Sequence, residues 1–459
     1  MRVLFTVFAA KPHFYNLVPM AWALRAAGHE VRVASQPDLT ETITRTGLTA
    51  VPVGDALNLW KSFAPEESDT RGGGTWQRLS GVSEGRESVL TWNYVLGTYT
   101  LACSMEYEHM AGQSMLDDVV AYCREWQPDL VIWDALTFVG PVGARACGAA
   151  HARMLFGIDY NSRMWTTYRT LLADRPPEQR DDPVGDWLAG RLGRYGLEYE
   201  PGLATELMTG QWTIDPTPGW MQLPTDLPRV PVRYVPYNGP TGIPDWVHEK
   251  PRHPRVCLSL GMSGRELLGN DKLSVDGGAS SDGITLDDLV STLAGLDIEL
   301  VATLRADQLL SPSELPRNVR AVEFVPLNEL LPSCAAVIHH GGFGTVGNVL
   351  THGVPSVTIP APWWDEAELG QDIAERGAGI FIDPSALTLD GLRESVVRLI
   401  GEPSFLENSL RARDDLRATP SPLQVVSELE ELTCRHRSTQ AHDVRGCHPE
   451  SKREREDVA

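Results

Sequence analysis

The stretch from His339 to Thr345, which reads His-His-Gly-Gly-Phe-Gly-Thr, holds the densest group of residues suited to chemistry. It follows a short apolar run at residues 335–338 and precedes a segment with a helical pattern. A glycine turn between a strand and a helix points backbone N–H groups, and the positive end of the helix dipole, at one place that a phosphate can approach closely. The sequence therefore predicts an anion site whose donors come from His340, Gly341, Gly342, Gly344 and Thr345.

The same stretch also contains the pattern G-x-G-x-x-G, through Gly342, Gly344 and Gly347, and Asp365 lies 21 residues beyond Gly344. This spacing is near that of a dinucleotide fingerprint, in which an acidic residue binds the ribose. The histidine pair has no part in that fingerprint, and an Ala-Pro-Trp-Trp segment separates Asp365 from the apolar run at residues 357–360. We therefore predict a carboxylate on a loop and keep an NAD-dependent oxidoreductase as an alternative function.

Two residues of the amino-terminal half are candidates for acid–base catalysis. His13 follows the apolar run at residues 3–10, and Asp134 follows the run at residues 130–133. Histidine titrates near neutral pH and suits removal of a proton from an attacking hydroxyl, while an aspartate can hold the other imidazole nitrogen. The alternatives are a solvated loop histidine for His13 and a helix N-cap for Asp134.

Strand-like runs that alternate with helical stretches must position these residues. The runs are residues 3–10, 30–35 and 130–133 in the first half, and 255–260, 299–302, 337–339 and 357–360 in the second. This rhythm predicts an α/β fold with two doubly wound, Rossmann-like domains, residues 1–228 and 255–434, and a cleft at the carboxyl ends of both sheets. The proline-rich residues 229–254 are the predicted linker.

Two further segments depart from this rhythm. Residues 55–115 contain Gly72-Gly73-Gly74 and the aromatic residues Trp76, Trp92, Tyr94 and Tyr99 without a clear strand, so we expect an insertion that carries specificity. Residues 435–459 are polar and highly charged without an apolar period, and we expect a disordered tail.

The composition excludes several classes of protein. The net charge of −21 repels polyanions and argues against a nucleic-acid partner. The seven cysteines are odd in number, scattered and never spaced C-x-x-C, which fits a reducing cytoplasm rather than a disulfide scaffold or zinc site. The first apolar run is short for a signal peptide, and no run approaches the roughly 18 apolar residues of a membrane span.

Several motifs resemble glycosyltransferase family 1. Residues 337–379 resemble the donor-binding motif of that family, and residues 13–19 with residues 27–29 resemble its amino-terminal signature. Residues 34–37 and 233–239 are most similar to actinobacterial enzymes that attach deoxysugars to polyketide aglycones of the macrolide and anthracycline type. The resemblance covers nearly the whole chain except the tail. It implies the GT-B architecture, with His13 as the general base and Asp134 as its partner.

The donor residues follow from chemistry and from this resemblance. A second set of phosphate donors is expected after the run at residues 255–260, with Ser263 among them. The resemblance places the nucleoside near Phe324 and Val325. Asn348 stands where glucose-transferring relatives have a ribose-binding glutamate, which favours thymidine. Asp365 and Glu366 stand where hexose-binding relatives have Asp-Gln; the carboxylate of Glu366 either pairs with an amino-sugar cation or is an ordinary exposed glutamate.

We therefore predict an inverting glycosyltransferase of antibiotic biosynthesis, which moves a deoxysugar from a dTDP donor to a hydroxyl of a hydrophobic polyketide aglycone. No D-x-D pattern occurs in the chain, and we expect no metal requirement and no cofactor. A nucleotide-sugar epimerase and a catalytically idle binding partner are further alternatives. The resemblance also makes a P450-like auxiliary activator protein a plausible partner, and a homodimer is left open.

Overall fold

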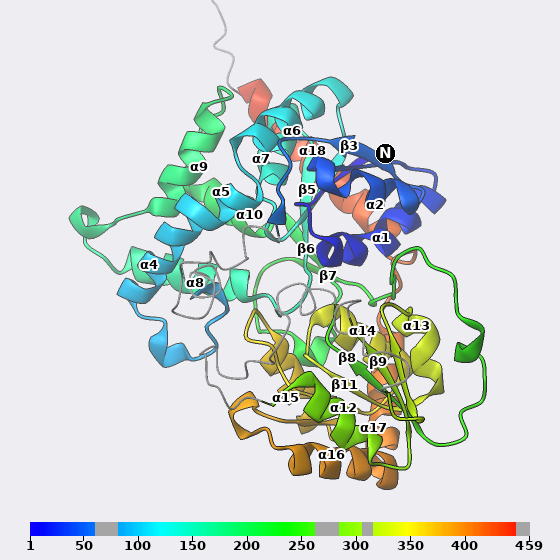
Figure 1. Cartoon of the computed structure of the whole chain (residues 1–459). Coiled ribbons are helices and arrows are strands. Elements are labelled where there is room, and N and C mark those ends of the chain that lie inside the picture. Colours follow the sequence, from blue (N-terminus) through cyan, green and yellow to red (C-terminus); the bar gives the residue numbers. More distant parts are fainter. Residues whose placement is uncertain (60–80, 262–283, 305–314, 447–459) are drawn as a thin grey trace, which may run out of the picture.

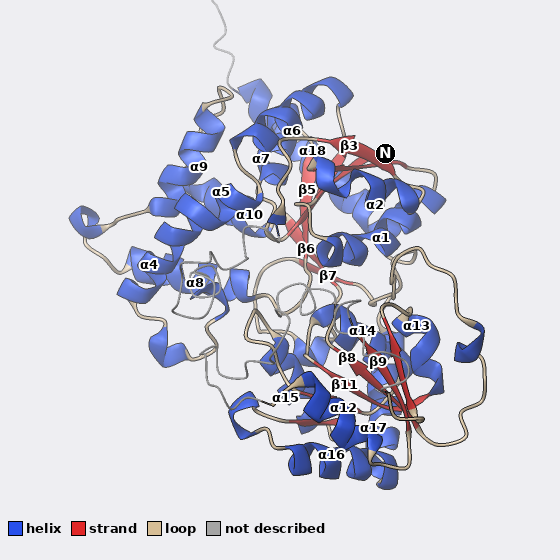
Figure 2. Cartoon of the chain, in the orientation of Figure 1, coloured by secondary structure: helices blue, strands red, loops and turns tan. Residues whose placement is uncertain are grey.

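The computed structural model describes residues 1–59, 81–261, 284–304 and 315–446, and it places them in two lobes, each built on a parallel β-sheet (Figures 1 and 2). The first sheet has seven strands in the order β3 (Thr49–Pro52), β2 (Glu30–Ser35), β1 (Arg2–Thr6), β4 (Leu130–Asp134), β5 (Ala150–Met154), β6 (Trp212–Asp215) and β7 (Arg229–Pro231). The second has six in the order β10 (Val319–Val322), β9 (Glu299–Thr303), β8 (Arg255–Ser259), β11 (Cys334–His339), β12 (Ser356–Thr358) and β13 (Gly379–Phe381). Two doubly wound domains are therefore present, as the sequence predicted.

Helices cover both sheets, and the central strands are buried along almost their whole length, as parallel strands generally are. The helices of the first lobe are α1 (Lys11–Ala26), α2 (Thr40–Arg45), α4 (Trp92–Leu101), α5 (Tyr107–Met110), α6 (Gln113–Trp126), α7 (Val139–Cys147), α8 (Tyr160–Ala173), α9 (Pro183–Gly193) and α10 (Ala204–Thr209). Those that follow are α12 (Leu286–Ala294), α13 (Leu327–Leu330), α14 (Phe343–His352), α15 (Glu366–Glu375), α16 (Leu389–Gly401), α17 (Pro403–Ala418) and α18 (Val426–Gly446).

The strand order changes direction at one pair of strands in each sheet. Strand β1 lies between β2 and β4, and β8 lies between β9 and β11. Successive connections leave such a pair toward opposite sides, which opens a crevice at the carboxyl ends of its strands. Each lobe therefore has one crevice, and the residues directly after β1, β4, β8 and β11 border it.

The first strand is shorter than the sequence predicted. It ends at Thr6 rather than Ala10. Val7 N–H still donates to the Ala34 carbonyl of β2 over 3.1 Å, but the next two amide groups bind side chains: Phe8 N–H donates to Thr137 Oγ1 over 3.0 Å, and Ala9 N–H donates to Gln36 Oε1 over 2.8 Å. Helix α1 then begins at Lys11, with a proline in its first turn, a position that proline tolerates. His13 therefore stands in the first turn of a helix and not in a loop.

The predicted insertion is helical where the structure describes it. It contains α4, a π-helical turn at Ala102–Glu106, and α5. Tyr99 is buried and packs against Trp165 and Tyr168, with ring centroids 6.2 and 4.9 Å away. The three glycines and Trp76 lie outside the described residues.

The predicted domain boundaries do not coincide with the packing. Within the predicted linker, β7 adds an edge strand to the first sheet. At the other end, Val425, Val426 and Leu429 belong to the hydrophobic core of the first lobe, and α18 continues through residue 446 (Figure 1). The prediction of disorder is wrong for residues 435–446, which continue this helix; the apolar residues that dock the helix lie before residue 435. Residues 447–459 lie outside the described part.

Contacts of α18 with the first lobe extend beyond the apolar core. Glu430 Oε1 lies 2.9 Å from His29 Nε2, the His436 ring lies 5.4 Å from Trp212, and Arg437 pairs with Asp129. The end of the chain thus returns to the amino-terminal domain and ties the two lobes together.

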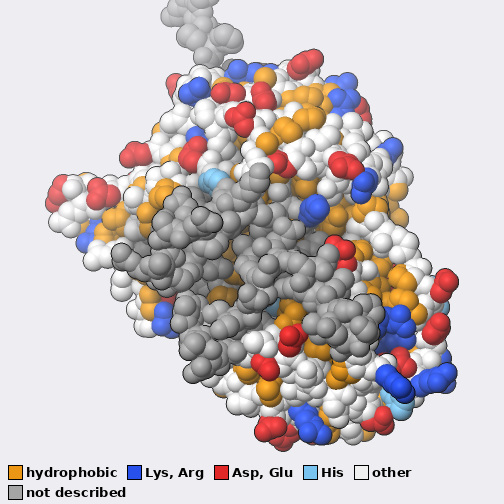
Figure 3. All heavy atoms as spheres, in the orientation of Figure 1, with side chains coloured by type: hydrophobic (Ala, Val, Ile, Leu, Met, Phe, Trp, Pro, Cys, Tyr) orange, Lys and Arg blue, Asp and Glu red, His pale blue; other side chains and the backbone are white. Residues whose placement is uncertain are grey.

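The surface carries charges of both signs. On the face shown in Figure 3, Asp and Glu side chains are spread over both lobes among Lys and Arg side chains. Within the described residues, no helix has the length and apolar character needed to cross a membrane.

Leu429→Ala tests the docking of α18. Leu429 is 0% exposed, so we expect its truncation to lower the free energy of unfolding by about 2–5 kcal/mol, measured by urea denaturation. Leu423→Ala is the control, because Leu423 is 60% exposed and its truncation should change stability by less than about 0.5 kcal/mol. Equal effects of the two substitutions would contradict the docking.

Candidate active site

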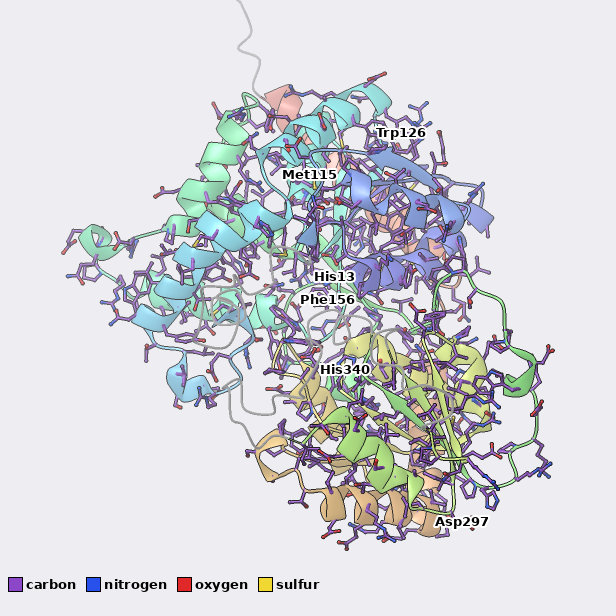
Figure 4. All side chains as sticks on the ribbon, in the orientation of Figure 1. His13, Met115, Trp126, Phe156, Asp297 and His340 are labelled. Atoms are coloured by element: carbon purple, nitrogen blue, oxygen red, sulfur yellow. The ribbon has the colours of Figure 1, made fainter. Side chains whose placement is uncertain are left out.

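A large cavity lies between the lobes, and residues after the carboxyl ends of strands in both sheets line its walls. It encloses about 390 Å³ and includes residues of the first lobe, of the second lobe and of the segment between them. Figure 4 shows His13 and Phe156 on the side of the first lobe and His340 on the side of the second. The two candidate sites found in the sequence therefore face the same space.

His13 and Asp134 form a hydrogen-bonded pair, although 121 residues separate them in sequence. His13 Nδ1 lies 2.9 Å from Asp134 Oδ2, and the aspartate side chain is 1% exposed. A carboxylate only accepts hydrogen bonds, so Nδ1 carries the proton, and the neutral ring is left with a lone pair on Nε2. Asp134 Oδ1 accepts from Leu136 N–H at 3.1 Å and from Thr137 Oγ1 at 3.3 Å, so Asp134 both shapes its turn and orients the imidazole.

Aromatic rings hold His13 from two directions. The imidazole centroid lies 4.6 Å from the Phe8 ring, at 60°, and 4.3 Å from the Phe156 ring, at 51°. The side chain of His13 is 18% exposed, enough for a ligand in the cavity to reach it. Packing and the Asp134 hydrogen bond together restrict rotation of the ring.

His340 lines the cavity from the end of β11, as predicted. Its Nδ1 accepts a hydrogen bond from Gly342 N–H over 3.3 Å, so in the neutral ring the proton is on Nε2. A side chain at Gly261 would put its Cβ 2.0 Å from that Nε2, and Gly261 has a φ of +70°, so glycine suits this turn on both counts. Desolvation lowers the pKa of His340 to about 4. It can thus offer an anion a neutral N–H donor.

His339 has a different environment from its neighbour. It is buried, its Nδ1 accepts from Gly341 N–H over 3.0 Å, and its Nε2 lies 3.5 Å from Thr358 Oγ1. Burial and the adjacent His340 lower its pKa to about 3. His339 therefore orders the turn from within the sheet, and the predicted donor of the pair is His340.

The remaining residues of the predicted diphosphate site surround the start of α14. Gly342 is the N-cap of this helix, and Gly342, Gly344 and Thr345 line the cavity. Gly341 has a φ of +90°, and a Cβ there would lie 2.6 Å from the carbonyl oxygen of Glu366. Ser263 lies outside the described residues.

The residues predicted to bind the nucleoside border one end of the cavity. Phe324 is 39% exposed and Val325 is buried, and both line it together with Tyr237 and Asn238 of the predicted linker. Asn348 is 1% exposed, and its Nδ2 donates to the Gly344 carbonyl over 2.7 Å. Its Oδ1 is buried and accepts no hydrogen bond from any residue that the structure describes.

Asp365 and Glu366 are both buried, so the alternative of an exposed Glu366 is wrong. Asp365 Oδ2 accepts from Ile158 N–H of the opposite lobe over 2.8 Å, and Glu366 Oε2 accepts from Trp364 N–H over 2.6 Å. Burial raises the pKa of both carboxyl groups, and the charge of Glu366 adds to the increase at Asp365. Each therefore carries a proton more readily than an ordinary carboxyl group.

Sequence reasoning missed several cavity residues, notably Glu106, Phe156 and Trp364. Phe156 comes two residues after β5, a strand whose polar residues His151 and Arg153 hid it from the apolar pattern. Had that strand been recognised, the same topological argument that found Asp134 would have indicated Phe156. Among the described residues, no group of three or more His, Cys, Asp or Glu is arranged to hold a metal ion.

Comparison with known protein families agrees with this arrangement. Residues 22–261 match the family described as Erythromycin biosynthesis protein CIII-like, N-terminal domain, and residues 287–432 match the corresponding C-terminal domain. The match thus covers most of the described chain.

Individual proteins are similar along their whole length. The aclacinomycin-T 2-deoxy-L-fucose transferase of Streptomyces galilaeus is 49% identical over 95% of this chain and 97% of its own. The 10-deoxymethynolide desosaminyltransferase of Streptomyces venezuelae is 44% identical over 95% and 98%. The crystal structure of the glycosyltransferase VinC in complex with dTDP is 42% identical, covers 95% of this chain and 100% of its own, and has a TM-score of 0.83. The predicted GT-B fold is confirmed.

Proposed function

Because this chain belongs to the Erythromycin biosynthesis protein CIII-like family and is a glycosyltransferase, we propose that it transfers a deoxysugar from a dTDP-sugar to a hydroxyl of a hydrophobic polyketide aglycone, with inversion. The similar transferases from both Streptomyces species are named for deoxysugars, and VinC was solved with dTDP. The proposal assigns His13 as the general base and the turn at residues 340–345 as the diphosphate site. The oxidoreductase, epimerase and idle-partner alternatives are set aside.

The observation that carries the proposal is the placement of a base and an anion site on facing walls of one cavity. His13, held by Asp134, presents Nε2 from the first lobe, and His340 with the start of α14 lies across from it. A hydroxyl that loses its proton to His13 attacks the anomeric carbon from the side opposite the diphosphate. Such a direct displacement inverts the anomeric centre.

Stabilising the departing diphosphate is the main electrostatic task, because negative charge accumulates on it as the sugar bond breaks. The Nε2–H of neutral His340 and the amino-terminal end of α14 are preorganised donors for that charge. The raised pKa of Asp365 and Glu366 reduces the negative charge that the second lobe places beside the diphosphate.

The nucleoside end supports a thymidine donor. Asn348 Oδ1 is a buried acceptor that can accept a hydrogen bond from the 3′-hydroxyl of the nucleoside. In a deoxyribose this is the one hydroxyl left on the ring, because the 2′-hydroxyl is absent. A glutamate at this position would carry a negative charge and would suit the 2′- and 3′-hydroxyls of a ribose. We assign the acceptor to the first lobe, where the apolar cavity residues Leu59, Met110 and Leu136 fit a hydrophobic aglycone. Binding of a P450-like auxiliary protein remains a prediction, and so does formation of a homodimer.

Calorimetric titration with dTDP, UDP and NAD in parallel, with chelator present, tests the donor assignment. We expect dTDP to bind most tightly. His340→Ala should weaken dTDP binding at least about tenfold, because it removes one neutral donor to the diphosphate, a loss of about 1.5–3 kcal/mol. His352→Ala is the control, since His352 ends the same helix and binds Asn328 over 3.1 Å. Unchanged affinity in His340→Ala, or binding of NAD alone, would refute the assignment.

His13→Ala should lower kcat at least about 10²-fold and leave the dTDP affinity nearly unchanged, because the base acts on the acceptor and not on the nucleotide. Steady-state kinetics with a dTDP-deoxysugar and an accepted aglycone would measure it. His253→Ala is a matched control: His253 Nδ1 lies 2.7 Å from Asp297 Oδ1, in a His–Asp pair far from the cavity (Figure 4). Normal turnover in His13→Ala would refute the assignment of His13 as the general base.

Glu366 should make donor binding depend on pH when the sugar carries an ammonium group. The pKa of Glu366 is raised by burial to about 7, and only its ionised form attracts a cation. The KM for a dTDP-amino sugar should therefore fall as the pH rises through about 7, whereas a neutral dTDP-deoxysugar should show no such fall. Glu366→Gln should flatten the profile. An identical profile in that variant would show that Glu366 does not bind the cation.

A further inference from the structure

The loop Leu155–Asp159, between β5 and α8, touches the catalytic histidine on one side and the donor-side carboxylate on the other. Its residue Phe156 lies against His13, and its Gly157-Ile158 peptide unit lies against Asp365. Figure 4 shows Phe156 next to His13 on the side of the first lobe and His340 on the side of the second.

The loop is firmly attached to the first lobe. The Leu155 carbonyl accepts from Asn16 Nδ2 over 2.6 Å, and the Gly157 carbonyl accepts from Thr217 Oγ1 over 3.0 Å. At its end, Asp159 caps α8 by accepting from Ser162 N–H over 3.0 Å. Asp159 also pairs with Arg153 of β5 over 2.6 Å, and both side chains are buried. These contacts leave the loop little freedom to change its conformation independently of its neighbours.

The contact with the second lobe requires a glycine. Ile158 N–H donates to Asp365 Oδ2, and a Cβ at Gly157 would lie 2.0 Å from the same oxygen. The φ of Gly157 is not in the left-handed region, so alanine there would be opposed by the carboxylate and not by its own backbone. Phe156 adds a ring contact with Trp364, at 5.6 Å between centroids.

The contact with His13 is equally direct. The Phe156 ring lies 4.3 Å from the imidazole centroid at an interplanar angle of 51°, while Asp134 holds Nδ1. Phe156 contributes packing and no hydrogen bond to the imidazole, so it acts on the orientation of the ring.

We propose that this loop couples the donor site to the base, with Phe156 as a positioning residue for His13 and Gly157 as the residue that lets Asp365 bind the loop. The inference rests on the proposed function. A donor sugar whose hydroxyl binds Asp365 changes the hydrogen bond to Ile158 N–H, and the loop carries that change to the Phe156 face of His13. His13 is thereby oriented when the complete dTDP-sugar is bound, and not when dTDP alone is bound.

The test uses NMR of the full chain labelled with ¹³C and ¹⁵N in its histidines, with the His13 signals assigned by their loss in His13→Asn. The probes are dTDP and dTDP-glucose, whose pyranose hydroxyls can reach Asp365. In the unsubstituted protein we expect dTDP-glucose to shift the His13 signals further than dTDP does. In Gly157→Ala that difference in shift should disappear. The dTDP affinity should stay within about twofold, because dTDP lacks the donor pyranose that would contact Asp365.

Gly219→Ala is the matched control, because nothing lies within 4 Å of an added Cβ there, and it should behave like the unsubstituted protein. Phe156→Leu, which keeps an apolar side chain but removes the ring, should reduce the same difference. Persistence of the full difference in Gly157→Ala and Phe156→Leu, or equal shifts with both probes in the unsubstituted protein, would overturn the coupling. Failure of the unsubstituted protein to bind dTDP is a separate result that would instead refute the proposed function.

Discussion

Parallel pairing of β1 with β4, and of β8 with β11, is the constraint on which the site depends. Thr6 is in register with Trp133, so Asp134 ends its strand at the height where the chain leaves β1 toward His13. Ser259 is in register with His339, which brings His340 beside the turn at Gly261. Since connections leave each pair toward opposite sides, both pairs open into crevices. Facing the two crevices toward each other produces one cavity with His13 on one wall and the turn at His340 on the other.

The proposed anion site, as far as the described residues form it, relies on N–H dipoles and not on a cationic side chain. The chain has a net charge of −21, and desolvation keeps both histidines of the turn neutral near pH 7. The N–H dipoles of this turn act at short range, on a ligand that is already bound. The same burial shifts Asp365 and Glu366 toward their neutral forms. One physical cause, exclusion of water, therefore keeps the two histidines neutral and also lowers the ionised fraction of the two carboxyl groups that would repel an anion.

How far the sequence predicts this molecule depends on where the information lies along the chain. The turn at His340 is a local pattern, and topology alone brings His13 to Asp134, so both were predictable. Strand β5 was not, because His151 and Arg153 interrupt its apolar pattern, yet both are fully buried and paired. Helix α18 was not either, because its average composition is polar and only one face docks. Contacts of this kind join residues that are far apart in the sequence, so no local stretch of the sequence indicates them.

Arg153, one of the two polar residues that interrupt the apolar pattern of β5, also explains the position of the loop that follows. A buried ion pair such as Arg153–Asp159 is not a strong source of stability, since desolvation of both charges offsets most of their attraction. An apolar pair would fill the same space without that penalty. What the ion pair provides is geometry: it ends β5, caps α8, and fixes the five residues between them where Phe156 meets His13 and Gly157 meets Asp365. A departure from the expected strand pattern thus coincides with a segment whose position matters to the chemistry.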